Sequence, residues 1–214
     1  MKYSCIIWDF NGTIADDVTL SINAINGVLA KRGLPQIKNM QAYQEVFGFP
    51  VREYYARLGF DFHMEPYEIP AKEWVDAYAA DMETITAVSG VKQVLEACRN
   101  AGMMQIILSA CETNMLYNIL GHLKLKHYFM KILTAEDIYG IGKISVAKKF
   151  AAETDMDLST ALLIGDTNHD AQTAKELGCD CVLYSGGHMA KEKLLSCGFT
   201  VMDQMSEVLH MIFS

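Results

Sequence analysis

The chain contains 214 residues, of which 51% are hydrophobic and 21% are charged, which suits one large globular domain or a core with a small second domain. Its formal net charge of −8 argues against nucleic acid as a partner, because no basic cluster offsets the repulsion from phosphates. No apolar run approaches the roughly 18 residues that span a bilayer. The N-terminal apolar run is too short for a signal peptide, and the scattered cysteines fit reduced core thiols. We therefore expect a cytoplasmic protein with no membrane partner.

The first predicted strand, residues 4–9, ends at Asp9 and is followed by a tight turn at Asn11-Gly12 and by Thr13. A carboxylate at the carboxyl end of a buried strand is the placement that α/β enzymes use for a nucleophile or a metal ligand. Asn11 is notable because it places an amide two residues after Asp9, where proton-transfer chemistry would need an acid.

Residues 16–86 contain no run that predicts a buried strand, and about seventy residues are too many for a simple crossover. We therefore expect an inserted helical cap domain over 16–86, with an α/β core made of 1–15 and 87–214. Hinges near 15–17 and 84–88 would let the cap open and close. The cap helices are predicted at 17–32, 39–47, 50–58 and 66–85.

The predicted cap is dense in aromatic residues between Tyr43 and Phe62. Packing of a small helical bundle is the favoured explanation, and a substrate pocket is the sharper alternative. Arg52 and Arg57 are expected to be solvated surface charges, although a guanidinium there would also suit a substrate carboxylate or phosphate.

After the predicted cap, short apolar runs alternate with helical patterns. The runs are rich in Ile, Val and Leu, as is typical of parallel strands buried on both faces. This alternation predicts a doubly wound, Rossmann-like α/β fold with a parallel sheet. The strands are predicted at 104–109, 130–134, 161–165 and 180–184, and the helices at 90–101, 113–123, 144–153 and 169–177.

Polar side chains stand where these predicted strands end. Ser109 ends the second strand, Lys143 follows the third at the start of a helix, and Asp166 ends the fourth, with Asp170 four residues later. Because the carboxyl ends of parallel strands converge on one crevice, we expect these side chains to meet Asp9 there. Taken singly, each has a simpler explanation as a turn, a helix cap or a solvated lysine, and their agreement favours a site.

Histidine is not expected to bind a metal, because the six histidines show no paired metal spacing. His169 and His188 are expected at the surface or at the rim of the crevice, and His188 follows Gly186-Gly187 beyond the fifth predicted strand.

Together these features resemble the haloacid dehalogenase superfamily, in particular its phosphoglycolate phosphatase-like members with a helical cap of the first class. The resemblance covers the whole chain. D-F-N-G-T stands for the first motif, Ser109 for the second, Lys143 for the third and G-D-T-N-H-D for the fourth. It implies a phosphatase that acts on a small phosphorylated metabolite, as a monomer or a homodimer.

The resemblance also implies the chemistry of the site. Asp9 would attack the phosphoryl group and become an aspartyl phosphate. Mg²⁺ would be held by Asp9, Asp166 and the backbone carbonyl of Asn11, because this cation prefers oxygen ligands. Asp170 would orient Lys143 or a water molecule bound to the metal.

The resemblance assigns the remaining motif residues to the phosphate. Ser109 and the N–H of Ala110 would hydrogen-bond a phosphoryl oxygen, and Lys143 would balance the carboxylate charge. Gly12 and Thr13 would shape and brace the turn that holds the phosphate.

Asn11 departs from the family pattern, in which typical phosphatases carry a second aspartate that protonates the leaving group. General acid–base help is worth about 10²–10⁴ in rate. One hypothesis is therefore a phosphatase that is slow, is specialised for good leaving groups such as acyl phosphates, or uses another acid such as Asp16 or Asp17. A non-catalytic phosphate- and Mg²⁺-binding module is the second hypothesis, and a dehalogenase-type hydrolase is the weakest.

Overall fold

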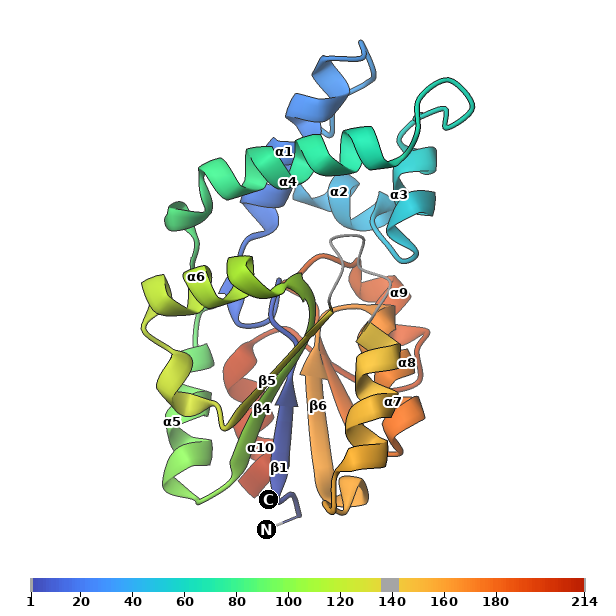
Figure 1. The fold of residues 1–214 in the computed structure, drawn as a ribbon. Coiled ribbons are helices and arrows are strands. Elements are labelled where there is room, and N and C mark those ends of the chain that lie inside the picture. The colour runs from blue at the N-terminus through green and yellow to red at the C-terminus, as the bar shows by residue number, and fades with distance from the viewer. Residues whose placement is uncertain (1, 136–142, 214) are drawn as a thin grey trace.

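Six parallel strands form the central sheet of the computed structural model, which describes residues 2–135 and 143–213 (Figure 1). The order is β5-β4-β1-β6-β7-β8, so the chain runs outward from β1 on one side and returns to fill the other. This reversal is the mark of a doubly wound fold, and the predicted fold class is confirmed. The strands are β1 Cys5–Trp8, β4 Met104–Glu112, β5 Lys131–Ala135, β6 Ala161–Gly165, β7 Asp180–Tyr184 and β8 Thr200–Met202.

Helices cover both faces of this sheet (Figure 1). Side chains alternate between the faces of a strand, so Ile6 and Trp8 of β1 join one apolar cluster, whereas Cys5 and Ile7 join another. The first cluster includes buried residues of α5, α6 and α10, and the second includes those of α7 and α8. These helices are α5 Val91–Asn100, α6 Thr113–Leu123, α7 Lys143–Glu153, α8 Asn168–Leu177, α9 Lys191–Leu195 and α10 Val208–Phe213, with 3-10 helices at Met82–Thr84, Lys126–Tyr128, Leu158–Thr160 and Met205–Glu207.

Four helices lie beyond the carboxyl-terminal edge of the sheet, and we call them the helical cap (Figure 1). They form an apolar cluster of their own, in which Ile25 and Leu29 pack with Tyr43, Tyr54 and Tyr55. The cap is inserted between β1 and β4, as expected. Its helices are α1 Val18–Ala30, α2 Met40–Val46, α3 Val51–Arg57 and α4 Glu68–Ala80.

Several expected boundaries were wrong. The helix expected over 66–85 ends at Ala80, and the chain continues through a 3-10 turn into β3, Thr86–Ala87, which pairs antiparallel with β2, Ala15–Asp16. These two-residue strands and the edge strand β8 are too short to produce a periodic signal. β4 also continues past Ser109 to Glu112, with an irregular register between these residues.

No helix within residues 2–135 and 143–213 combines the length and the apolarity that crossing a membrane requires.

Candidate active site

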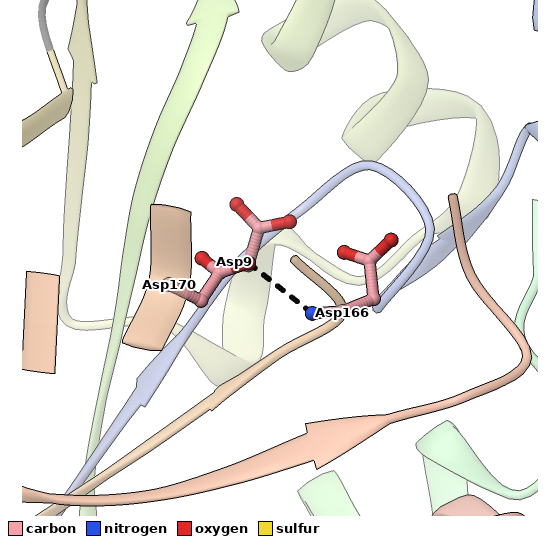
Figure 2. Close-up of side chains that lie close together, drawn as sticks. All are labelled: Asp9, Asp166 and Asp170. Carbon is pink, nitrogen blue, oxygen red and sulfur yellow. Dashed lines mark hydrogen bonds between the residues drawn. The ribbon is translucent and has the colours of Figure 1, made fainter. Parts of the chain in front are cut away.

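Asp9 and Asp166 stand at the same edge of the sheet because their strands are neighbours in register. Trp8 pairs with Ile164, and the N–H of Asp9 donates to the carbonyl of Ile164 at 2.8 Å. Asp166 follows the last residue of β6 directly. Figure 2 shows the carboxyl groups of Asp9, Asp166 and Asp170 gathered at this edge.

Lys143, the first residue of α7, joins Asp9 to Asp170. Its Nζ donates to Oδ1 of Asp9 and to Oδ1 of Asp170, and all three residues are buried. Burial, together with the charge of Asp170, raises the pKa of Asp9 well above its usual range, although Lys143 opposes the shift. The ammonium therefore offsets only part of the negative charge around Asp9.

Both oxygens of Asp170 are engaged by protein donors. Oδ1 meets Lys143, and Oδ2 accepts from the N–H of Thr167 at 2.9 Å, from Thr167 Oγ1 at 2.6 Å and from the N–H of Asp166 at 3.2 Å, the last drawn as the dashed line in Figure 2. Burial alone would raise the pKa of Asp170, but the charge of Lys143 outweighs it and lowers the pKa. Asp170 is thus placed to hold Lys143 and the start of α8.

Asp166 is held by the turn after β1 and by the loop after β7. Thr13 Oγ1 donates to Oδ1 at 3.1 Å, and the backbone N–H of His188 donates to Oδ2 at 2.6 Å. Gly12 and Gly187 permit this close packing, because a Cβ on Gly12 would lie 2.4 Å from Oδ2 of Asp166 and one on Gly187 would lie 2.2 Å from it. Burial raises the pKa of Asp166 to about 6.

The acidic cluster fits a divalent cation. Asp9, Asp166 and Asp170 each offer an oxygen within 4.8 Å of the others. Four buried carboxyl groups, counting Asp17, face two cationic groups, Lys143 and His188, so the cluster carries two negative charges in excess when all four carboxyl groups are ionised. Buried charge of this kind is costly unless it is paired or binds a metal, and carboxylate oxygens suit hard cations.

Ser109 lies at the same edge, two residues beyond the pairing of Ile107 with Trp8. It is buried, and its Oγ accepts from the N–H of Cys111 at 3.0 Å. Ala110 and Cys111 line the cavity above Asp9, whereas Ser109 does not.

The side chain of Asn11 is committed as a hydrogen-bond donor. Its Nδ2 donates to Asp17 Oδ2 at 2.8 Å and lies 3.0 Å from the hydroxyl of Tyr78, a residue of α4 in the cap. Tyr78 also donates to Asp17 Oδ2 at 2.8 Å, and the N–H of Gly12 donates to Oδ1 at 2.8 Å. The amide thus links the turn after β1 to the cap, and it has no proton to exchange with a substrate.

Comparison with known proteins identifies the family. The haloacid dehalogenase-like hydrolase family model matches residues 6–184. The chain belongs to this family. It is therefore a hydrolase, and the expected kinship with phosphatases is confirmed.

Relatives of this haloacid dehalogenase-like hydrolase include a phosphoglycolate phosphatase of Caulobacter vibrioides, 26% identical over 190 residues, which cover 86% of this chain and 79% of that protein. One from Rhodobacter capsulatus is also 26% identical, with 86% and 84% covered. Among solved structures, a haloacid dehalogenase-like hydrolase from Streptococcus pneumoniae superposes with a TM-score of 0.85 at 18% identity, covering 99% of both chains. That likeness concerns the fold.

His188 lines the cavity above Asp9, whereas the sequence placed it at the surface or at the rim of the crevice. It is buried rather than at the surface or rim: Nε2 lies 3.2 Å from Asp17 Oδ1, and Nδ1 lies 2.8 Å from the hydroxyl of Tyr43 in α2. Burial lowers the pKa of His188, but the charge and hydrogen bond of Asp17 outweigh burial and raise it to about 9. Its position after two glycines was the one local feature of the sequence that pointed to the site.

His169 also departs from the expected surface position, because its ring is buried with its centroid 4.5 Å from that of Phe49. Tyr78 had no local signal at all, since it resembles any aromatic residue on the apolar face of a cap helix.

The helical cap and the sheet edge enclose a cavity of about 350 Å³ that opens onto Asp9. Asp9, Asn11, Ala110 and Lys143 line it from the core. Aromatic side chains line it from the cap: Tyr43, Phe47, Phe49, Tyr54, Tyr55, Tyr67, Trp74 and Tyr78. The cap aromatics thus both pack the cap and face the site.

Proposed function

We propose that this hydrolase is a Mg²⁺-dependent phosphatase that acts on a small phosphorylated metabolite through an aspartyl phosphate on Asp9. The observation that carries the proposal is the buried arrangement in which Lys143 bridges Asp9 and Asp170 while Asp166 stands beside them with uncompensated charge. Relatives named phosphoglycolate phosphatase support phosphate esters as substrates.

In this proposal Mg²⁺ is held by Asp9, Asp166 and the backbone carbonyl of Asn11. When bound, the ion screens the phosphate from the carboxylates and polarises the phosphoryl group. Asp170 contributes by orienting Lys143, because both its oxygens already accept hydrogen bonds from protein groups. The charge excess at the edge of the sheet supports a divalent ion over a monovalent one.

The protein groups divide the reaction into two displacements. A carboxylate oxygen of Asp9 attacks phosphorus, and the bond from phosphorus to the leaving-group oxygen breaks. Water then attacks the phosphorus of the aspartyl phosphate, which returns the carboxylate and releases phosphate. Ser109, the N–H of Ala110 and Lys143 stabilise the phosphoryl oxygens.

The turn residues Gly12 and Thr13 support the phosphate site in this proposal. Gly12 leaves room beside Asp166, and Thr13 fixes the carboxyl group of Asp166 by its hydrogen bond.

The absence of a general acid beside Asp9 limits the substrates that this phosphatase would cleave. Asn11 has no proton to give, and Asp16 is exposed. Burial would raise the pKa of Asp17, but His188 and the other hydrogen-bond donors outweigh burial and lower it, so Asp17 is ionised at neutral pH. We therefore expect good leaving groups, such as the carboxylate of an acyl phosphate, to be cleaved far faster than alkyl alcohols.

A binding module that holds Mg²⁺ and phosphate without turnover is the second candidate, favoured by the hydrogen bonds of Asn11. The cap boundaries 16–86 are also proposed, and the pairing of β2 with β3 at these positions supports them. A cytoplasmic location and a monomeric or homodimeric state stay predictions.

The test is hydrolysis of acetyl phosphate, p-nitrophenyl phosphate and phosphoglycolate with Mg²⁺ by the natural chain, Asp9→Asn and Asn11→Asp. We expect Asp9→Asn to be inactive. Asn11→Asp should gain about 10²–10⁴, the usual worth of a general acid, on benzyl phosphate, an alkyl ester without a carboxylate that is tested beside the other three. Asp17 beside it would raise the pKa of the new carboxyl group, which favours the protonated form that an acid needs.

Asn100→Asp is the matched control, because Asn100 is exposed at the end of α5, and it should change nothing. If the natural chain and Asn11→Asp are both inert on every substrate while Mg²⁺ still binds, the phosphatase proposal fails and the binding module replaces it.

A further inference from the structure

The cavity above Asp9 is the place that the leaving group of a bound phosphate ester would occupy. Asp9 forms part of its wall, and the cap forms the side that faces away from the sheet. Its lining therefore bears on which substrates the proposed phosphatase accepts.

Positive charge is scarce in this lining. Among the lining residues that the structure describes, Lys143 is the one lysine or arginine, and Asp9 and Asp170 both engage it. The imidazole of His188 is paired with Asp17. The ring of His169 is buried and lies against that of Phe49, with the ring centroids 4.5 Å apart.

Neither arginine of the aromatic region supplies the missing cation. The guanidinium of Arg52 lies 5.1 Å from the ring centroid of Phe62, Nε of Arg57 donates to the carbonyl of Val46 at 3.0 Å, and neither residue lines the cavity. Residues 136–142, which lie outside the described part, read E-D-I-Y-G-I-G and contain no lysine or arginine.

A carboxylate on the leaving group would therefore lose its hydration without gaining a cationic partner, which is costly in a buried site. Asp17 and Glu112 in the lining would add repulsion. Phosphoglycolate, from which the relatives take their name, carries such a carboxylate.

Aromatic rings dominate the opposite wall. Phe47 lies at the centre of a ring cluster, with centroid distances of 5.2 Å to Tyr43, 5.1 Å to Tyr54 and 5.8 Å to Phe49. Such walls favour flat, apolar ligand bodies, which gain by desolvation and by ring contacts.

Two polar atoms in this region have no partner in the described part of the chain. They are the hydroxyl of Tyr54, a residue 3% exposed, and Nδ1 of His169, a residue 7% exposed. Both residues line the cavity. Neighbouring protein atoms cover both of them, so they are not presented to a ligand in the cavity.

We propose that the leaving group of the substrate is uncharged and aromatic, and that carboxylate-bearing phosphate esters are excluded. This inference rests on the proposed phosphatase function, since it assigns the cavity to the leaving group.

The test uses phosphonates, which bind without being cleaved, so that binding is measured apart from turnover. Calorimetry with Mg²⁺ compares phosphonoacetate, 4-carboxybenzylphosphonate and 4-carbamoylbenzylphosphonate. The last two are nearly identical in shape and differ in charge. We expect the carbamoyl compound to bind at least tenfold more tightly than the carboxy compound, and phosphonoacetate to bind most weakly.

Variants test whether the compounds bind in the cavity. Phe47→Ala should weaken binding of the carbamoyl compound about tenfold by removing a ring from the wall of the cavity. Phe213→Ala, at an exposed ring of α10, is the matched control and should leave binding unchanged. Thermal unfolding confirms that each variant is folded.

Equal binding of the carboxy and carbamoyl compounds, tighter binding of phosphonoacetate, or no binding of any of the three by the folded natural chain would each overturn the inference. Hydrolysis of acetyl phosphate is measured in parallel. Its loss alone, with the binding order intact, counts against the phosphatase proposal and not against the assigned chemistry of the cavity.

Discussion

Asp17 links the cap to the core through its hydrogen bonds. It accepts hydrogen bonds from Asn11, Gly12 and Tyr78, and it faces His188 on its remaining side. Without the imidazole, this buried carboxylate would have neutral donors alone to offset its desolvation. His188 therefore has a structural role, and the free energy of unfolding should depend on its charge.

The stability of the free protein should depend on the protonation of His188. Its pKa is raised from 6.5 to about 9 in the folded state, so the ion pair contributes fully below pH 6.5 and its contribution is lost as the pH rises through about 9. At about 1.4 kcal/mol for each pKa unit, the free energy of unfolding should fall by up to about 3 kcal/mol over this window.

Urea unfolding in a chelator at pH 6.5, 8 and 9.5 measures this loss. His188→Asn should lack this component, whereas the exposed control His63→Asn should retain it. An identical pH dependence for His188→Asn and the natural chain would contradict the assignment.

At the scale of elements, the turn after β1 is shaped by its contact with the loop after β7. Gly12 has φ +71°, in the left-handed region, and its Cα faces Asp166 and His188 from a distance at which no side chain fits. The turn therefore has to be placed together with the end of β6 and with the loop after β7, although more than 150 residues separate Gly12 from Asp166.

Gly12→Ala should lower the free energy of unfolding by more than about 1–2 kcal/mol, because left-handed backbone strain of that size is joined by a clash with Asp166. Gly27→Ala in α1 is the matched control. No atom lies within 4 Å of its added Cβ, and the change should stabilise the helix by about 0.5–1 kcal/mol. Urea unfolding of both variants checks this, and shifts of the same sign would contradict it.

In the whole molecule, three apolar clusters surround a polar seam: one of the core, one of the cap, and one that continues from the core into α1 and α4 through Leu20, Ala24 and Tyr78. The seam contains Asp9, Asp17, Asp166 and Asp170, which are buried by the meeting of cap and sheet. The fold thus holds excess negative charge where its two parts join, and a divalent ion should stabilise the whole protein.

Mg²⁺ at about 100 times its dissociation constant should raise the free energy of unfolding by about 2.7 kcal/mol, which for a chain of this length is roughly 5–10 °C in the melting temperature. Asp166→Asn should abolish the shift, and the exposed control Asp155→Asn should retain it. Calorimetric melting with Mg²⁺ and with a chelator tests this. A shift that persists in Asp166→Asn would place the ion elsewhere.

Local sequence patterns were sufficient to predict a site residue where that residue stands at the end of a strand or at the start of a helix. An apolar run that ends in a polar residue marks a strand end, and for this reason Asp9 and Asp166 were predicted at the sheet edge and Lys143 at the start of a helix. Parallel strands then bring such ends together without further information. Elements of two or three residues, such as β2, β3 and β8, carry no periodic signal and were missed.

Runs of neighbouring residues were enough to predict the doubly wound sheet, the inserted helices and the set of acidic and basic residues at the strand ends. The packing of distant elements was needed to show that Tyr78 and His188 converge on Asp17, and that the cap aromatics face Asp9 across a cavity with little positive charge. These features join residues up to 171 positions apart, and a contact over such a separation depends on how whole elements pack.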